Sequence, residues 1–105
     1  MLNRIMMIEL IANFTAGGLL INTIPHLTAG LRGERFPSPF ARPPGVGNSH
    51  PMINVGWGMS NLIAGLLLLN FAPVTIGFHP SFLLSVTGAT VCGLFLAYYF
   101  GRLRR

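Results

Sequence analysis

Residues 31–52 read LRGERFPSPFARPPGVGNSHPM, and this stretch decides how the chain is divided. It holds five of the eight prolines and three of the seven arginines of the 105-residue chain. Each proline fixes its own φ, lacks an N–H donor and drives the residue before it toward extended geometry, so this density is incompatible with a regular helix or a central strand. The stretch therefore predicts an irregular polar loop. Because proline leaves the unfolded chain less entropy to lose, we expect that loop to be well defined.

Long apolar runs lie on both sides of this loop. Residues 5–25, 53–72 and 81–101 each have the length that a helix needs to cross a bilayer core, about 20 residues. The first run either ends near Pro25 or bends there and continues to residue 31, since a membrane helix tolerates both. We therefore predict an all-α membrane protein. Residues 1–105 form a single integral membrane domain, with three transmembrane helices and a proline- and arginine-rich loop, residues 32–52, between the first two helices.

Composition and charge support this class. Only 9% of the residues are charged, whereas soluble domains carry about 25%. The arginines flank the apolar runs and do not line one amphipathic face, which is typical of charges that fix topology and argues against nucleic acid binding. Six arginines belong to the side shared by the loop and the C-terminus, and Arg4 belongs to the other. The positive-inside rule then predicts an N-terminus outside and a C-terminus in the cytoplasm.

Small residues recur every four positions along the last run. The series is Ser81, Ser85, Ala89, Gly93, Ala97 and Gly101. Residues four apart share a helix face, and small side chains allow a second helix to approach closely. The series predicts a packing face, against another helix of the same chain or against another subunit.

Polar residues inside the spans are the second feature. They are Glu9, Asn13, Asn22 and Asn61. An unpaired polar group facing lipid costs free energy, so each is expected to face protein or water. One hypothesis is hydrogen bonding between helices, with Glu9 reaching the outer interface or pairing with Arg4. The other is a polar path for a proton, an ion or a small solute.

The histidines and arginines near the loop suggest two kinds of site. Two histidines and a carboxylate form a known metal-ligand set, and His26, Glu34 and His50 lie at or within the loop. Their spacing matches no compact motif, so structural histidines are the alternative. The three loop arginines alternate with phenylalanines, which suits phospholipid headgroups or another anion; they are Arg32, Arg35 and Arg42. The alternative for the loop is a rigid tether between two helices.

Four short motifs carry a resemblance. They are N-x-x-P-H (residues 22–26), F-P-S-P-F (residues 36–40), P-P-G (residues 43–45) and N-V-x-W-G (residues 54–58). In these motifs, across residues 22–61, the chain resembles a group of small, uncharacterised bacterial integral membrane proteins. The resemblance implies a bacterial origin and a membrane location, and hence the cytoplasmic (inner) membrane. It implies no activity and no site residues.

Motifs of common enzymes are missing from the sequence, including the phosphate-binding loop, the nucleophile elbow and the H-E-x-x-H zinc motif. We therefore expect a non-enzymatic accessory subunit or homo-oligomer without a cofactor. Its partners would be the lipid bilayer and either itself or a larger membrane complex. The alternatives are an oligomeric transporter or channel that uses Glu9 and the span asparagines, and a metal-binding or enzymatic site at His26, Glu34 and His50.

Overall fold

The computed structural model describes residues 2–104, and three helices account for most of them. They are α1 (Arg4–Leu31), α2 (Pro51–Phe71) and α3 (Pro80–Leu103). All three are long and apolar enough to cross a membrane, which confirms the predicted helical class. α1 continues through Pro25 to Leu31, the longer of the two expected extents.

α2 and α3 both begin with the same capping motif, the dipeptide His-Pro. Pro51 and Pro80 occupy the first turn of their helices, where the missing N–H would have had no partner. The histidine before each proline caps the helix through its side chain. Nδ1 of His50 accepts from the amide of Met52 at 3.0 Å, and Nδ1 of His79 accepts from the amide of Ser81 at 3.2 Å. Two local signals thus fix where both helices begin.

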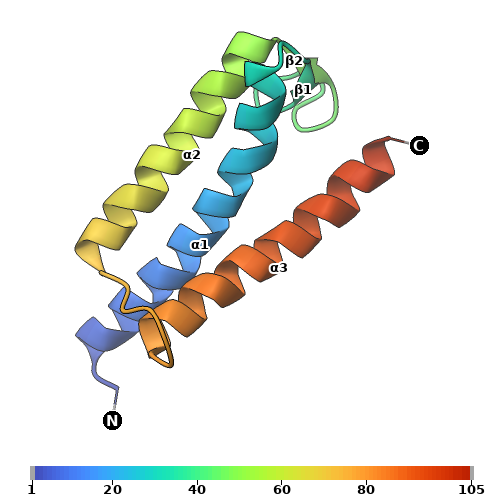
Figure 1. Cartoon of the computed structure of the whole chain (residues 1–105). Coiled ribbons are helices and arrows are strands. Elements are labelled where there is room, and N and C mark those ends of the chain that lie inside the picture. Colours follow the sequence, from blue (N-terminus) through green and yellow to red (C-terminus); the bar gives the residue numbers. More distant parts are fainter. Residues whose placement is uncertain (1, 105) are drawn as a thin grey trace.

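The loop between α1 and α2 contains regular structure that the proline content did not predict. Strand β1 (Phe36–Pro37) pairs antiparallel with β2 (Asn48–Ser49), with Phe36 opposite Ser49. Pro37 is tolerated because a two-residue ladder consists of edges only, so a missing donor need not interrupt a central strand. The result is a small folded cap at one end of α1 and α2 (Figure 1).

α1 packs against both other helices. Figure 1 shows α2 running beside α1 along most of its length, whereas α3 crosses the N-terminal half of α1 and diverges toward its own C-terminus. Glycines set the close approaches. A Cβ on Gly30 would lie 2.7 Å from the Pro51 carbonyl oxygen, and one on Gly58 would lie 2.9 Å from the Leu27 nitrogen. α1 therefore meets α2 with backbone close to backbone, as small residues allow in membrane helices.

Contact between α1 and α3 is closer still but more local. A Cβ on Gly17 would overlap the carbonyl oxygen of Ser85, and one on Gly88 would overlap the carbonyl oxygen of Phe14. Beyond this crossing point the contact loosens, because a Cβ on Gly93 would meet only one atom, of Ile21, at 3.6 Å. α3 thus packs most closely on α1 in its first half.

Candidate functional site

His26 and Asn54 form the centre of the capped end. The Nδ1 atom of His26 lies 2.9 Å from Oδ1 of Asn54, and the two side chains are 3% and 0% exposed. The amide nitrogen of Asn54 donates to the carbonyl oxygen of Phe36 at 2.9 Å and lies 3.3 Å from that of Ser49. Because these acceptors fix which end of the amide is nitrogen, Oδ1 must accept from His26. His26 therefore carries a proton on Nδ1, and because burial disfavours a charged imidazolium, Nε2 carries the lone pair.

Aromatic rings surround the imidazole. The ring centroids of Phe36, Phe100 and Trp57 lie 5.5, 6.1 and 6.3 Å from that of His26, all edge to face. The four rings come from β1, the end of α3, α2 and α1, so the cluster joins every part of the capped end. We call His26, Asn54, Phe36, Trp57 and Phe100 the His26 cluster.

Hydrogen bonds hold the cap over this cluster. The hydroxyls of Ser38 and Ser49 lie 2.5 Å apart and are buried, and the amide of Phe40 donates to the Ser38 oxygen at 3.1 Å. From α3, the Tyr99 hydroxyl donates to the carbonyl oxygen of Gly45 at 2.7 Å. The cap is thus tied within itself and to the end of α3.

A second polar pair lies one helical turn from His26. The amide nitrogen of Asn61 donates to the carbonyl oxygen of Trp57 at 2.8 Å, which leaves Oδ1 of Asn61 as an acceptor. Asn22 donates to that oxygen at 3.0 Å through its own amide nitrogen. Its Oδ1 atom therefore points elsewhere and has no hydrogen-bond partner among residues 2–104. The asparagine pair bonds α1 to α2, as the interhelical hypothesis expects.

Two hollows adjoin these side chains. One of about 170 Å³ lies beside the His26 cluster, and its walls include Asn22, His26, Trp57 and Tyr99. Another of about 520 Å³ runs between α1 and α3. They have Asn22 and Phe95 in common, so they are neighbours on one face of the molecule. We call the pair the His26 trench.

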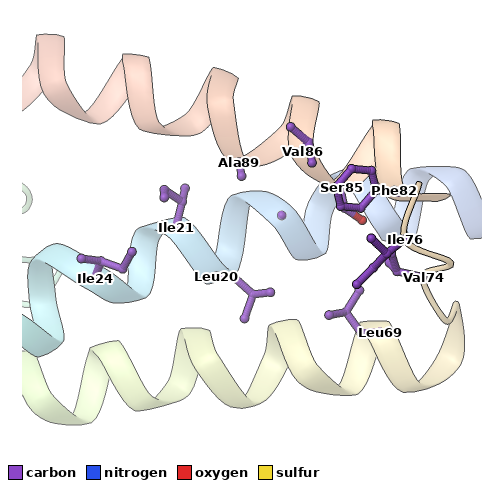
Figure 2. Close-up of a pocket in the computed structure, with 11 residues that line it drawn as sticks. Leu20, Ile21, Ile24, Leu69, Val74, Ile76, Phe82, Ser85, Val86 and Ala89 are labelled. Carbon is purple, nitrogen blue, oxygen red and sulfur yellow. The ribbon is translucent and has the colours of Figure 1, made fainter. Parts of the chain in front are cut away.

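A third hollow lies between α2 and α3 and is apolar. It has a volume of about 480 Å³. Figure 2 shows α1 at its floor, with Leu20, Ile21 and Ile24 between the other two helices. Its only hydroxyl belongs to Ser85. Among the described residues, the Ser85 oxygen is the one buried side-chain polar atom without a hydrogen-bond partner.

At the opposite end of the molecule, Glu9 and Asn13 line a hollow of about 270 Å³ together with His79 and Ser81. Asn13 is 1% exposed and donates to the carbonyl oxygen of Ala72, just after α2, at 2.7 Å. Its side chain thus satisfies a helix-end carbonyl, while Glu9 is half-buried on the wall of the hollow. Asn13 and the Asn22–Asn61 pair bond α1 to α2 at two separate levels.

The residues predicted for metal binding do not meet. His26 is bonded to Asn54, His50 caps α2 and is exposed, and Glu34 pairs with Arg32 at 2.8 Å. Across residues 2–104 there is no group of three or more histidine, cysteine or acidic side chains placed to hold a metal ion.

The loop arginines are also dispersed. Arg32 is engaged by Glu34, and Arg42 is exposed. Arg35 lines a hollow of about 250 Å³ together with Arg104 and Asn48. Pro37 and Phe100 belong to the walls of both this hollow and the His26 trench, so they lie between the arginines and His26.

The small residues of α3 divide into two groups. Ser81, Ser85 and Ala89 are buried or half-buried on the side of α1, Gly93 is half-buried, and Ala97 and Gly101 are exposed. The cause is helix geometry, because a step of four residues turns about 40° past a full turn, so the series winds around the helix. Only its first half can therefore face α1.

Sequence reasoning missed three residues that build the site: Asn54, Ser38 and Tyr99. The available signal was the asparagine in N-V-x-W-G, one turn before Trp57 at the start of an apolar run, where a buried amide needs partners. Nothing in the sequence indicated that Tyr99 reaches a glycine carbonyl 54 residues away. Comparisons with models of protein families, with characterised proteins and with solved structures find no match to this chain.

Proposed function

We propose that this protein is a small, non-enzymatic, multi-pass subunit of the bacterial cytoplasmic membrane that assembles through the outer face of α3. The assembly is a homo-oligomer, or a larger membrane complex that this chain joins. The N-terminus lies outside, and the cap and the C-terminus lie in the cytoplasm.

The outward face of α3 is the observation that carries the proposal. Thr90, Leu94, Ala97 and Gly101 are exposed there, and nothing lies within 4 Å of where a Cβ on Gly101 would be. Ala97 and Gly101 form a small-x-x-x-small pair, the spacing at which membrane helices approach most closely. The first half of the same series already packs closely against α1, where the backbone of Ser85 and Ala89 lies against Gly17. A second helix on the outer half would complete the pattern.

The proposed orientation is supported by the joining of the cap to the end of α3. The Tyr99–Gly45 hydrogen bond places residues 32–50 at the same end as the C-terminus. Arg32, Arg35, Arg42, Arg102 and Arg104 therefore gather at one end, and Arg4 begins α1 at the other. Such an asymmetry favours the arginine-rich end in the cytoplasm.

Disulfide crosslinking in membranes tests the assembly. In a Cys92→Ser background, Ala97→Cys should form a crosslinked dimer on mild oxidation, because a two-fold interface brings a central residue close to its own copy. Ile63→Cys, which is 52% exposed on α2, is the matched control and should stay monomeric. Equal crosslinking at both positions, or none at Ala97→Cys, would refute self-assembly through α3.

Two exposed asparagines test the orientation. In the same background, a membrane-impermeant maleimide should label Asn3→Cys in intact bacterial cells and should label Asn48→Cys only after lysis. Both side chains are exposed, at opposite ends of the molecule. The reverse labelling would invert the proposed topology.

A further inference from the structure

We infer that the His26 trench binds a neutral amphiphile whose head carries a hydroxyl group and whose tail lies between α1 and α3. The inference relies on the proposed location of the helices in a bilayer, and not on assembly through α3. Three features of the trench support it: two unpaired acceptor atoms, the lack of charge around them, and an apolar channel that continues from them.

The orientation of each acceptor is fixed by an asparagine whose amide nitrogen donates to a backbone carbonyl oxygen. Asn54 holds the His26 proton on Nδ1, and Asn61 holds the amide nitrogen of Asn22 toward itself. Nε2 of His26 and Oδ1 of Asn22 are therefore both acceptors, four residues apart on one face of α1. Within residues 2–104, the Ser85 hydroxyl is the one unpaired side-chain polar atom that is fully buried. Nε2 of His26 and Oδ1 of Asn22 are therefore accessible from the trench. A ligand that satisfies them must bring hydrogen-bond donors.

The walls around the two acceptors exclude a charged head. The lining residues beside His26 include prolines, aromatic rings and Leu96, and no arginine, aspartate or glutamate. Arg35 and Arg104 line a separate hollow on the other side of Pro37 and Phe100. An anionic or cationic head would lose its hydration here and gain no counter-charge, which is costly. A hydroxyl, as an alcohol or a phenol, supplies a donor without charge.

The tail has a channel of suitable chemistry. From Asn22 and Phe95 the trench continues past Gly18, Leu19 and Cys92, and its volume there is about 520 Å³. It ends near Phe14 and Gly88, where α1 and α3 touch. A single apolar chain that enters from the lipid would lie along this channel with its head at His26. The trench thus has one polar end and one apolar end, as an amphiphile does.

Trp57 provides a direct test, because it is the single tryptophan of the chain and lines the polar end of the trench. Bromine quenches indole fluorescence at short range. We would titrate the purified full-length protein in lipid nanodiscs with two probes, a nonylphenol brominated next to its hydroxyl and a hexadecanol brominated next to its hydroxyl carbon. The methyl ether of each probe has the same body without the donor.

Saturable quenching should require about five- to tenfold less alcohol than ether, the factor expected for one or two hydrogen bonds. A larger ratio in the phenol series would identify a ring hydroxyl as the natural head, and a larger ratio in the hexadecanol series an aliphatic one. Equal quenching by alcohol and ether in both series would overturn the inference, since it would reflect partition into lipid alone.

Variants locate the two ends of the ligand. His26→Phe keeps a ring but removes the acceptor, so the advantage of alcohol over ether should fall by at least half. Gly18→Leu should fill the channel and weaken quenching by both alcohols about tenfold. Gly56→Leu is the matched control and should leave quenching unchanged, because Gly56 is exposed on α2, lines neither hollow of the trench and has nothing within 4 Å of an added Cβ. Unchanged quenching in Gly18→Leu would overturn the inference. This test stands even if His26→Phe fails to fold, and neither result bears on crosslinking at Ala97.

Discussion

The contact of α1 with α2 differs in kind from its contact with α3. Between α1 and α2, side chains form hydrogen bonds at three levels. His26 bonds to Asn54, Asn22 bonds to Asn61, and Asn13 bonds to the carbonyl oxygen just after α2. Between α1 and α3, no side-chain hydrogen bond is found within residues 2–104, and the contact relies on glycines at one crossing point and on the Phe100 ring beside His26. The hydrogen bonds fix the register of α1 and α2 at several positions along their length, whereas the glycines fix α1 and α3 only at one crossing point. The difference indicates that α1, α2 and the cap form one specified unit, to which α3 is attached.

Removing the centre of the specified unit should have the largest effect. Asn54→Leu leaves the Nδ1–H of His26 and the carbonyl oxygens of Phe36 and Ser49 without this partner in a buried place. We expect the free energy of unfolding in detergent to fall by about 3 kcal/mol, since each buried group left unsatisfied costs about 1–3 kcal/mol. Denaturant titration followed by Trp57 fluorescence measures this.

The matched control is Asn70→Leu, an asparagine of the same helix that is exposed. It should change the unfolding free energy by less than about 0.5 kcal/mol. Equal effects of the two substitutions would mean that the His26 cluster does not hold α1 and α2 together.

A substitution at the crossing point of α1 and α3 should have the second-largest effect on the free energy of unfolding. Gly17→Val places a branched side chain where even a Cβ would overlap the Ser85 carbonyl oxygen. Backbone cannot give way as a flexible side chain can, so we expect a loss of about 2–3 kcal/mol, in the upper range for overpacking.

Gly18→Ala, next in the chain, is the control for Gly17→Val, because its nearest neighbour would lie at 3.7 Å. If α3 is attached separately, Gly17→Val should release it while Trp57 keeps its native emission. If α3 is released and the native Trp57 emission is lost together, the three helices unfold as one unit.

The link from α3 to the cap should have a smaller effect. Tyr99→Phe removes the hydrogen bond to the Gly45 carbonyl, worth about 1 kcal/mol, and keeps the ring. Because Arg35 in the cap is exposed and is followed by Phe36, trypsin should cleave there several times faster in the variant. Tyr98→Phe, whose hydroxyl accepts a bond from exposed Arg102, is the control and should leave the cleavage rate unchanged.

This contrast also explains what could be predicted from the sequence. The three helices followed from the length and apolarity of their runs, which are local properties. The sequence groups His26 with Glu34 and His50, because two histidines and a carboxylate at one loop form a known metal-ligand set. The actual partner of His26, Asn54, lies 28 residues away. The ladder in the cap and the divergence of α3 depend on contacts between distant segments, which spacing alone does not determine.

The smallest effect, with the opposite sign, should come from the attached helix itself. Ser85→Ala removes a buried hydroxyl that has no partner among the described residues and that faces the apolar hollow of Figure 2. Such a group loses its hydration without gaining a bond, so its removal should stabilise the protein slightly, by up to about 1 kcal/mol. Ser81→Ala, whose hydroxyl accepts from the Thr75 amide at 3.0 Å, should instead destabilise by about the same amount. A loss of stability in Ser85→Ala would show that this hydroxyl has a partner in the membrane, and α3 would then be bonded on that face and not merely packed.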